Sequence, residues 1–170
     1  MLHILARLLL AMPLLASATS QSPDAVRVEG QTRYTFSTPL DEAHSQAPAL
    51  WARLQSALPS DRCSTHWRGY TAGWELVADE LRLTELASFN CHQGSRAIPL
   101  EVLEPGASGP IRATWFSGEL SFEVGPRVAG PCGYSPTCPS GHEVWVFEKG
   151  RRVRSEYRPF SPAGGAGQRK

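Results

Sequence analysis

Apolar and polar residues alternate over residues 70–77, and the alternation resumes after a break at residues 79–80. Alternation with a period of two is typical of a strand that buries one face. A two-residue turn at the break would place Leu76 opposite Leu83 and keep both on the face of Trp74. A three-residue turn would move Leu83 to the other face. The pattern therefore predicts a central β-hairpin with a two-residue turn.

Two further hairpins are predicted nearer the C-terminus. A turn at residues 117–118 would gather the apolar residues of 111–124 on one face, and a turn at residues 149–150 would create a third hairpin. In the third hairpin Trp145 and Phe147 would lie opposite arginines of the next strand. Such pairs are placed for cation–π contact.

The N-terminal half adds one predicted helix over residues 45–58. Pro48 suits a first helical turn, Leu50 and Leu54 recur at four-residue spacing, and Pro59 ends the pattern. Short strands are expected at residues 32–37 and 97–103. The fold class is therefore predicted to be mainly β (α+β), an antiparallel sheet of hairpins with the helix packed on it. A small β-sandwich or half-barrel is the alternative.

The chain divides into four predicted segments. Residues 1–18 have the organisation of a secretory signal peptide, with a basic residue, an apolar run and an Ala-x-Ala cleavage site. Residues 19–30 are expected to be a loose leader, residues 31–160 a single mainly-β domain, and residues 161–170 a disordered tail. The signal peptide predicts a periplasmic or secreted protein.

Charge narrows the choice of partner. Removal of residues 1–18 takes away only Arg7, so the 17 Lys and Arg become 16, equal to the 16 Asp and Glu. Nucleic acid is disfavoured as a partner because it would require a basic surplus. No apolar run after the signal peptide is long enough to span a membrane. A protein or another component of the cell envelope is the expected partner.

All four cysteines lie after the signal peptide: Cys63, Cys91, Cys132 and Cys138. An even number of cysteines in an oxidising compartment indicates two disulfides, for which three pairings are possible. Cys132 with Cys138 would close a short loop, and Cys63 with Cys91 would tie the start of the central hairpin to the segment after it. Zinc is the alternative, because His66, His92 and His142 lie near cysteines. Structural zinc sites usually show C-x2-C pairs, which the chain lacks, so disulfides are favoured and no metal or cofactor is expected.

The sequence contains no familiar catalytic motif, neither G-x-S-x-G, a P-loop, H-E-x-x-H nor a calcium loop. A hydrolase that uses His66 or His92 with a nearby carboxylate is the enzymatic alternative. Glu75 and Glu85 are expected to lie opposite each other, where two carboxylates could share a proton. Solvated or arginine-paired carboxylates are the plainer interpretation, and a non-catalytic domain is favoured.

The stretch GPCGYSPTCPSGH, residues 130–142, is predicted to be a loop closed by Cys132 and Cys138. A disulfide at its neck would reduce the entropy cost of ordering the loop on binding. Tyrosine is a common anchor at interfaces, which makes the loop a candidate binding site. Its candidate residues are Gly133, Tyr134, Ser135 and His142. The alternative is a long connection stapled only for stability.

Two blocks of residues, W-R-G-Y-x-A-x-W-E followed by L-x-L, and A-x-W-x-x-G-x-L, resemble those of an uncharacterised family of exported bacterial proteins. The matching residues here are Trp67, Arg68, Gly69, Tyr70, Ala72, Trp74, Glu75, Leu81 and Leu83, then Ala113, Trp115, Gly118 and Leu120. The pair Gly133-Tyr134 and the turn at residues 148–150 also match. The chain departs from the family in bracketing that pair with Cys132 and Cys138. The resemblance implies a bacterial exported protein and supplies no established activity.

The sequence as a whole predicts an exported, disulfide-stapled, non-catalytic domain that binds a protein or envelope partner. One concrete version, by analogy alone, is a periplasmic inhibitor or immunity-type protein for a cell-wall hydrolase. The competing interpretations are a hydrolase and a metal-binding envelope protein.

Overall fold

A computed structural model describes residues 21–61, 64–132 and 135–160; the predicted signal peptide and C-terminal tail lie outside them. The helical elements are α1 (Ala43–Gln46), α2 (Pro48–Ala57) and the 3-10 helices η1 (Ser64–His66) and η2 (Leu100–Val102). The strands are β1 (Asp24–Val28), β2 (Gln31–Thr35), β3 (Tyr70–Val77), β4 (Glu80–Asn90), β5 (Gly94–Ala97), β6 (Ile111–Arg112), β7 (Glu119–Cys132), β8 (Ser135–Glu148) and β9 (Arg151–Pro159).

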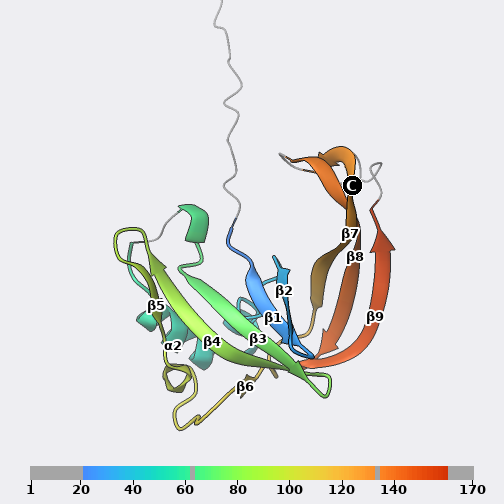
Figure 1. The fold of residues 1–170 in the computed structure, drawn as a ribbon. Helices are drawn as coiled ribbons and strands as arrows, with labels where there is room; N and C mark the ends of the chain where they lie inside the picture. Colours follow the sequence, from blue (N-terminus) through green and yellow to red (C-terminus); the bar gives the residue numbers. More distant parts are fainter. Residues whose placement is uncertain (1–20, 62–63, 133–134, 161–170) are drawn as a thin grey trace, which may run out of the picture.

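These strands form one curled sheet in the order β2-β1-β3-β4-β9-β8-β7, with β5 and β6 also paired to β4. The predicted mainly β fold is confirmed. The sheet is mixed, because β1 runs parallel to β3 while the other pairs are antiparallel. Its two outermost strands, β2 and β7, approach each other without closing a barrel (Figure 1).

The central hairpin β3–β4 has the predicted two-residue turn, one position earlier than expected. Ala78 and Asp79 form the turn, with φ of 48° and 65°, values typical of a type I′ turn. Glu80 belongs to β4 instead, where its carboxylate contacts two arginines. Leu76 therefore lies opposite Leu81 and not Leu83. The buried face is unchanged, because a shift of two residues in the pairing equals the period of the side chains. The residues of that face are buried: Tyr70, Ala72, Trp74, Leu76, Leu81 and Leu83.

The predicted hairpin at residues 117–118 is wrong. β6 pairs with β4, through Leu83 and Ile111, whereas β7 pairs with β8, so residues 113–118 connect distant parts of the sheet. The indole N–H of Trp115 donates to the Pro39 carbonyl at 3.0 Å and holds the connection against a second loop. The apolar residues still share one core, which the alternation could not distinguish from a hairpin.

The third hairpin is confirmed, with its turn at Lys149 and Gly150. A bulge between Val146 and Phe147 shifts the register beyond it. As a result Trp145 lies opposite a serine, and the guanidinium of Arg152 lies 4.9 Å from the Trp145 ring. The expected opposition of Phe147 and Arg152 is confirmed, whereas that of Trp145 and Arg154 is wrong. The cation–π contact with Trp145 is made by Arg152.

The predicted loose leader is also wrong, since residues 24–28 form β1 between β2 and β3. The buried carboxylate of Asp24 accepts hydrogen bonds from Arg68 Nη2 at 3.2 Å, Trp74 Nε1 at 3.1 Å and the Ala72 N–H at 3.3 Å. Burial raises the pKa of Asp24, and these three donors oppose that rise. The W-R-G-Y-x-A-x-W block therefore has a structural use, because three of its residues hold Asp24.

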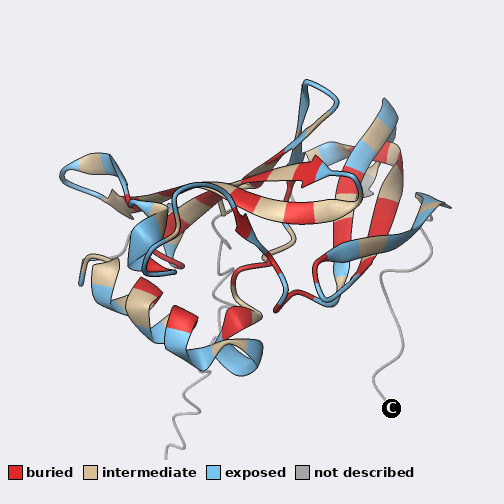
Figure 2. Cartoon of the chain, turned by 90° about the horizontal axis from the view of Figure 1, so that it is seen from below, coloured by how far each residue is buried: buried red, intermediate tan, exposed pale blue. Residues whose placement is uncertain are grey.

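The predicted helix is interrupted near its start. Ala47 leaves the helical conformation, with φ of −143° and ψ of 64°, and so separates α1 from α2. The residue before a proline is disfavoured in the α region, so Pro48 explains the break. Leu50 and Leu54 are buried in the core shared with the sheet, and Figure 2 shows the buried residues of α2 gathered on one side. The strand predicted at residues 97–103 is replaced by the end of β5 and by η2.

Candidate functional site

The stretch predicted to be a loop lies instead at the far end of the β7–β8 hairpin. β9 ends opposite Gly141, so beyond that point the hairpin is two-stranded and extends past the rest of the sheet (Figure 1). We call residues 125–132 and 135–141 the arm. Gly133 and Tyr134, two of the predicted binding residues, lie outside the described residues, and their role stays a prediction.

The predicted disulfide between Cys132 and Cys138 is present in the arm, with a Cα–Cα distance of 5.3 Å. Cys138 is buried, and the Gly130 carbonyl oxygen lies 3.4 Å from its sulfur. The bond ties the end of β7 to a residue of β8 that lies opposite Val128. The second predicted pair includes Cys63, which lies outside the described residues, so the Cys63–Cys91 pairing stays a prediction.

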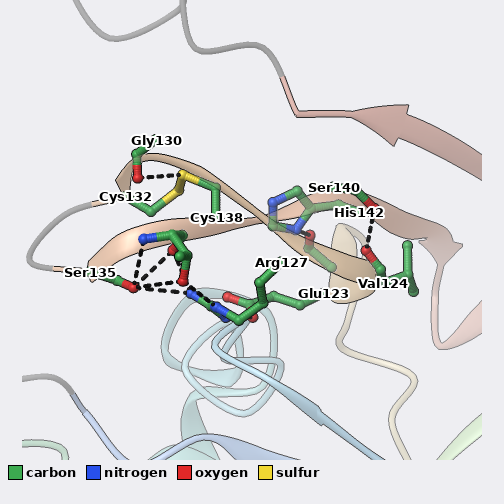
Figure 3. A network of polar contacts seen from close by, with 11 residues as sticks. Glu123, Val124, Arg127, Gly130, Cys132, Ser135, Cys138, Ser140 and His142 are labelled. Carbon is green, nitrogen blue, oxygen red and sulfur yellow. Dashed lines mark hydrogen bonds and ion pairs between the residues drawn. A yellow bond between two sulfur atoms is a disulfide. The ribbon is translucent and has the colours of Figure 1, made fainter.

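A single arginine, Arg127 of β7, links the two strands of the arm through hydrogen bonds to β8 (Figure 3). Arg127 Nε donates to Thr137 Oγ1 at 2.9 Å, and its Nη2 donates to the Thr137 carbonyl at 2.6 Å and to Ser135 Oγ at 3.2 Å. Its Nη1 donates to Glu123 at 3.2 Å. Ser135 Oγ in turn donates to the Thr137 carbonyl at 2.8 Å. The predicted binding residue Ser135 is therefore a cross-strand brace.

His142 lies at the base of the arm, where its Nδ1 is 3.2 Å from Ser121 Oγ (Figure 3). A nucleophilic triad contains a serine hydrogen-bonded to a histidine, together with a carboxylate that orients the imidazole. In the part of the chain that the structure describes, no carboxylate bonds to His142. The pair therefore lacks the third member of a triad.

His142 also lines a groove of about 700 Å³ between β2 and β7. The end of β2 and the residues after it meet β7 beside this groove, where Thr35 Oγ1 donates to the Ser121 carbonyl at 2.9 Å and the Ser121 N–H donates to Ser37 Oγ at 3.2 Å. The other lining residues are Thr32, Arg33, Tyr34, Phe36, Phe122 and Glu123. We call this junction of β2 and β7 the seam.

Arg33 crosses the seam from β2 to β8. Its guanidinium lies 4.3 Å from the Phe122 ring and 2.8 Å from the carboxylate of Glu143, to which the Trp145 indole N–H also donates at 2.6 Å. Partial burial opposes ionisation of Glu143, but the hydrogen bonds from Arg33 and Trp145 outweigh it and lower its pKa. Sequence reasoning missed this site, because nothing in the local pattern pairs β2 with β7.

The histidines of the enzymatic alternative lie apart from carboxylates. His66 stacks on Phe89 with ring centroids 3.9 Å apart, and burial together with the nearby charge of Arg68 lowers its pKa. The exposed His92 is held through its backbone N–H, which donates to the Asn90 side chain at 2.8 Å. Within residues 21–61, 64–132 and 135–160, neither ring contacts an acidic group.

The expected opposition of Glu75 and Glu85 is wrong. Glu75 lies opposite Arg82, and a bulge after Gly73 places Glu85 opposite that glycine. Among the described residues, no three His, Cys, Asp or Glu side chains gather where they could hold a metal ion. No helix of the described residues is long and apolar enough to cross a membrane.

No protein family, curated protein or solved structure matches the chain. The resemblance to a family of exported bacterial proteins therefore stays a prediction. What the structure adds is a physical use for its first block, in which Arg68 and Trp74 bond to Asp24 and the Tyr70 hydroxyl donates to Asp41 at 2.5 Å.

Proposed function

We propose that this protein is an exported, non-catalytic binding module that contacts a protein partner through the arm. The observation that carries the proposal is that two independent links join the strands of the arm. One is the Cys132–Cys138 disulfide, and the other is the set of hydrogen bonds from Arg127 to Thr137. A segment ordered before binding loses less conformational entropy when it binds. Disulfides persist in oxidising compartments, which agrees with export to the periplasm or beyond.

The chemistry of the arm favours a protein surface. Arg127 is its one charged residue, and that charge is paired with Glu123. Because Ser135 and Cys138 make their contacts within the arm, the side chains left for a partner are small and apolar, with Val128 and Ala129 exposed. Nucleic acid and anionic membranes bind through clustered basic residues, which the arm does not present.

A photo-crosslinking experiment tests this proposal with a matched control. A photoreactive residue is placed at Val128 on the arm and, separately, at Val77 beside the β3–β4 turn; these valines are 40% and 37% exposed. Illumination in the native envelope fraction should give a discrete crosslinked protein from position 128 and none from position 77. Equal crosslinking from both positions, or none from position 128, would contradict the proposal.

A cell-wall hydrolase is the partner class that the arm fits best, because a narrow hairpin of two strands, whose one charge is already paired, can enter an active-site cleft. The protein with its disulfide intact should then inhibit a muramidase or an amidase. The Cys132→Ser, Cys138→Ser double variant should inhibit more weakly, since its arm must be ordered on binding. If no muramidase or amidase of a panel is inhibited, a cell-wall hydrolase is excluded as the partner class. The proposal that the arm binds a protein is then decided by the crosslinking experiment.

A further inference from the structure

The seam brings together the two ends of the sheet. β2 and β7 occupy opposite ends of the strand order, so each has one side on which none of the described strands pairs with it. They touch where the hydroxyls of Thr35 and Ser37 bond to the backbone of Ser121. Exposed strand edges carry backbone donors and acceptors that can pair with another chain. The groove beside this contact lies between two such edges.

The turn before β2 shows which of its backbone groups face the groove. Glu29 and Gly30, with φ of 49° and 79°, form a two-residue turn, so Val28 and Gln31 are its closing hydrogen-bonded pair. In an antiparallel pair hydrogen-bonded and non-hydrogen-bonded positions alternate. Thr32 and Tyr34 therefore direct their N–H and C=O groups away from β1, towards the groove.

The same reasoning applies to β7. Gly118 and Phe147 exchange both backbone hydrogen bonds, at 3.1 and 2.8 Å, which sets the alternation along the β7–β8 pair. Ser121 and Glu123 then direct their backbone groups away from β8. Side-chain hydroxyls take both groups of Ser121, whereas the backbone of Glu123 faces the groove.

The side chains around these backbone groups are aromatic and exposed. Tyr34 is 64% exposed and Phe36 is 60% exposed, although both line the groove. The charged residues there are already paired, Arg33 with Glu143 and Glu123 with Arg127. The groove therefore offers apolar rings and backbone groups that no described strand pairs with, and the acidic and guanidinium groups that line it are already in ion pairs.

We infer that the groove binds an extended peptide segment of a partner protein, added to the sheet along β2. Backbone groups that recur at every second residue are matched in spacing by another extended polypeptide, the mode known as β-augmentation. Alternate side chains of the peptide are apolar and pack on Tyr34 and Phe36. The site is separate from the contact proposed for the arm, and each can hold without the other.

The probe is a set of ten-residue peptides selected from a displayed random library on the disulfide-intact protein. Binding is measured by fluorescence polarisation, and each selected peptide is then N-methylated at one position at a time. Methylation should weaken binding at every second position, by about three- to tenfold, because it removes one backbone donor. Uniform tolerance of N-methylation, or a library without enriched peptides, would overturn the inference.

Proline substitutions test the protein side of the same hydrogen bonds. Thr32→Pro removes a backbone donor that faces the groove, whereas Thr32→Ala keeps that donor. Tyr34→Pro and Tyr34→Ala repeat the comparison two residues later, and both of these variants lack the aromatic ring. Proline is tolerated at strand edges when its missing N–H faces solvent. Each proline variant should bind about three- to tenfold more weakly than its alanine match. Equal affinity within both pairs would contradict the inference.

Melting curves show whether the variants fold, and where a proline variant does not, the N-methylated peptides decide the question alone. The Cys132→Ser, Cys138→Ser variant should bind the peptides with unchanged affinity, which separates this site from the arm. Analytical ultracentrifugation of the protein alone completes the test. A dimer that Thr32→Pro dissociates would identify a second copy of this chain as the occupant and overturn the assignment to a partner.

Discussion

The indole N–H of Trp74 donates a hydrogen bond of 3.1 Å to the carboxylate of Asp24, a residue 50 positions earlier in the chain. Both side chains are buried, and Arg68 shares the same carboxylate at 3.2 Å. Because Asp24 lies at the start of β1 and Trp74 in β3, this contact fastens the parallel pair at the middle of the sheet. Removal of either side chain leaves the polar group of the other buried without that hydrogen bond.

Trp74→Ala should lower the free energy of unfolding by about 3–5 kcal/mol, as expected for the truncation of a buried aromatic side chain. Trp67→Ala is the matched control, because Trp67 lies in the same sequence block and its side chain is 59% exposed. The control should change stability by less than about 0.5 kcal/mol. Urea unfolding followed by circular dichroism measures both, and equal losses would show that the block does not act through burial.

Gly150→Ala should destabilise the protein more than Gly30→Ala does. Both glycines have positive φ, 77° and 79°, so alanine is strained at either by roughly 1–2 kcal/mol. A Cβ at position 150 would also lie 2.5 Å from the Ala113 carbonyl oxygen, whereas one at position 30 meets nothing within 4 Å. The clash should add about 1–3 kcal/mol. Equal midpoints in denaturant for the two variants would contradict the close packing of the β8–β9 turn against residue 113.

Short-range patterns predicted much of this fold. The alternation around Trp74 gave the correct buried face, and the turn at Lys149 and Gly150 was assigned correctly because glycine readily adopts the positive φ that this turn requires. Contacts between segments that are far apart in the sequence could not be predicted from short-range patterns. The segment around Trp115 has the alternation of a hairpin strand, but its neighbours are chosen by contacts with β4 and with Pro39.

The Cys132→Ser, Cys138→Ser variant should lose order locally rather than unfold as a whole. The disulfide joins residues six positions apart, for which the chain-entropy account gives a contribution of about 2 kcal/mol. Because the arm is two-stranded, amide hydrogens of residues 125–132 should exchange faster while those of β3 and β4 keep their protection. Hydrogen exchange with mass spectrometry checks this. Faster exchange throughout the sheet would show that the arm supports the core.

Acid should weaken the Arg33–Glu143 contact across the seam. The pKa of Glu143 lies below its ordinary value, so the ionised carboxylate stabilises the fold, and this contribution is lost as the pH falls through the folded-state pKa. The stability difference between the unmodified protein and Glu143→Gln should be largest well above pH 4.5, the ordinary pKa of the group, and should shrink below it. Denaturant titrations at several pH values measure it. A difference independent of pH would mean that Glu143 gains nothing from Arg33.

The candidate site was only partly accessible from the sequence. The number of cysteines and the expected compartment indicated disulfides, and the structure shows which of the possible partners Cys132 has, namely Cys138. Whether His142 contacts a partner stays a prediction. The role of Arg127 could not be predicted, since its partners Thr137 and Ser135 face it only after β7 and β8 pair. The seam depends on contacts between residues 86 positions apart, for which periodicity carries no signal.

The position of β1 also bears on how the chain folds. β1 pairs with β2 across a two-residue turn, which can form within microseconds, but its other neighbour is β3, more than 40 residues later. β2 contacts β7 through Thr35, which bonds to Ser121, 86 residues later in the chain. Contacts between distant residues form slowly because long loops must close first. The first hairpin of the chain therefore depends for its surroundings on contacts that close long loops, and we expect such contacts to limit the folding rate more than the local hairpins do.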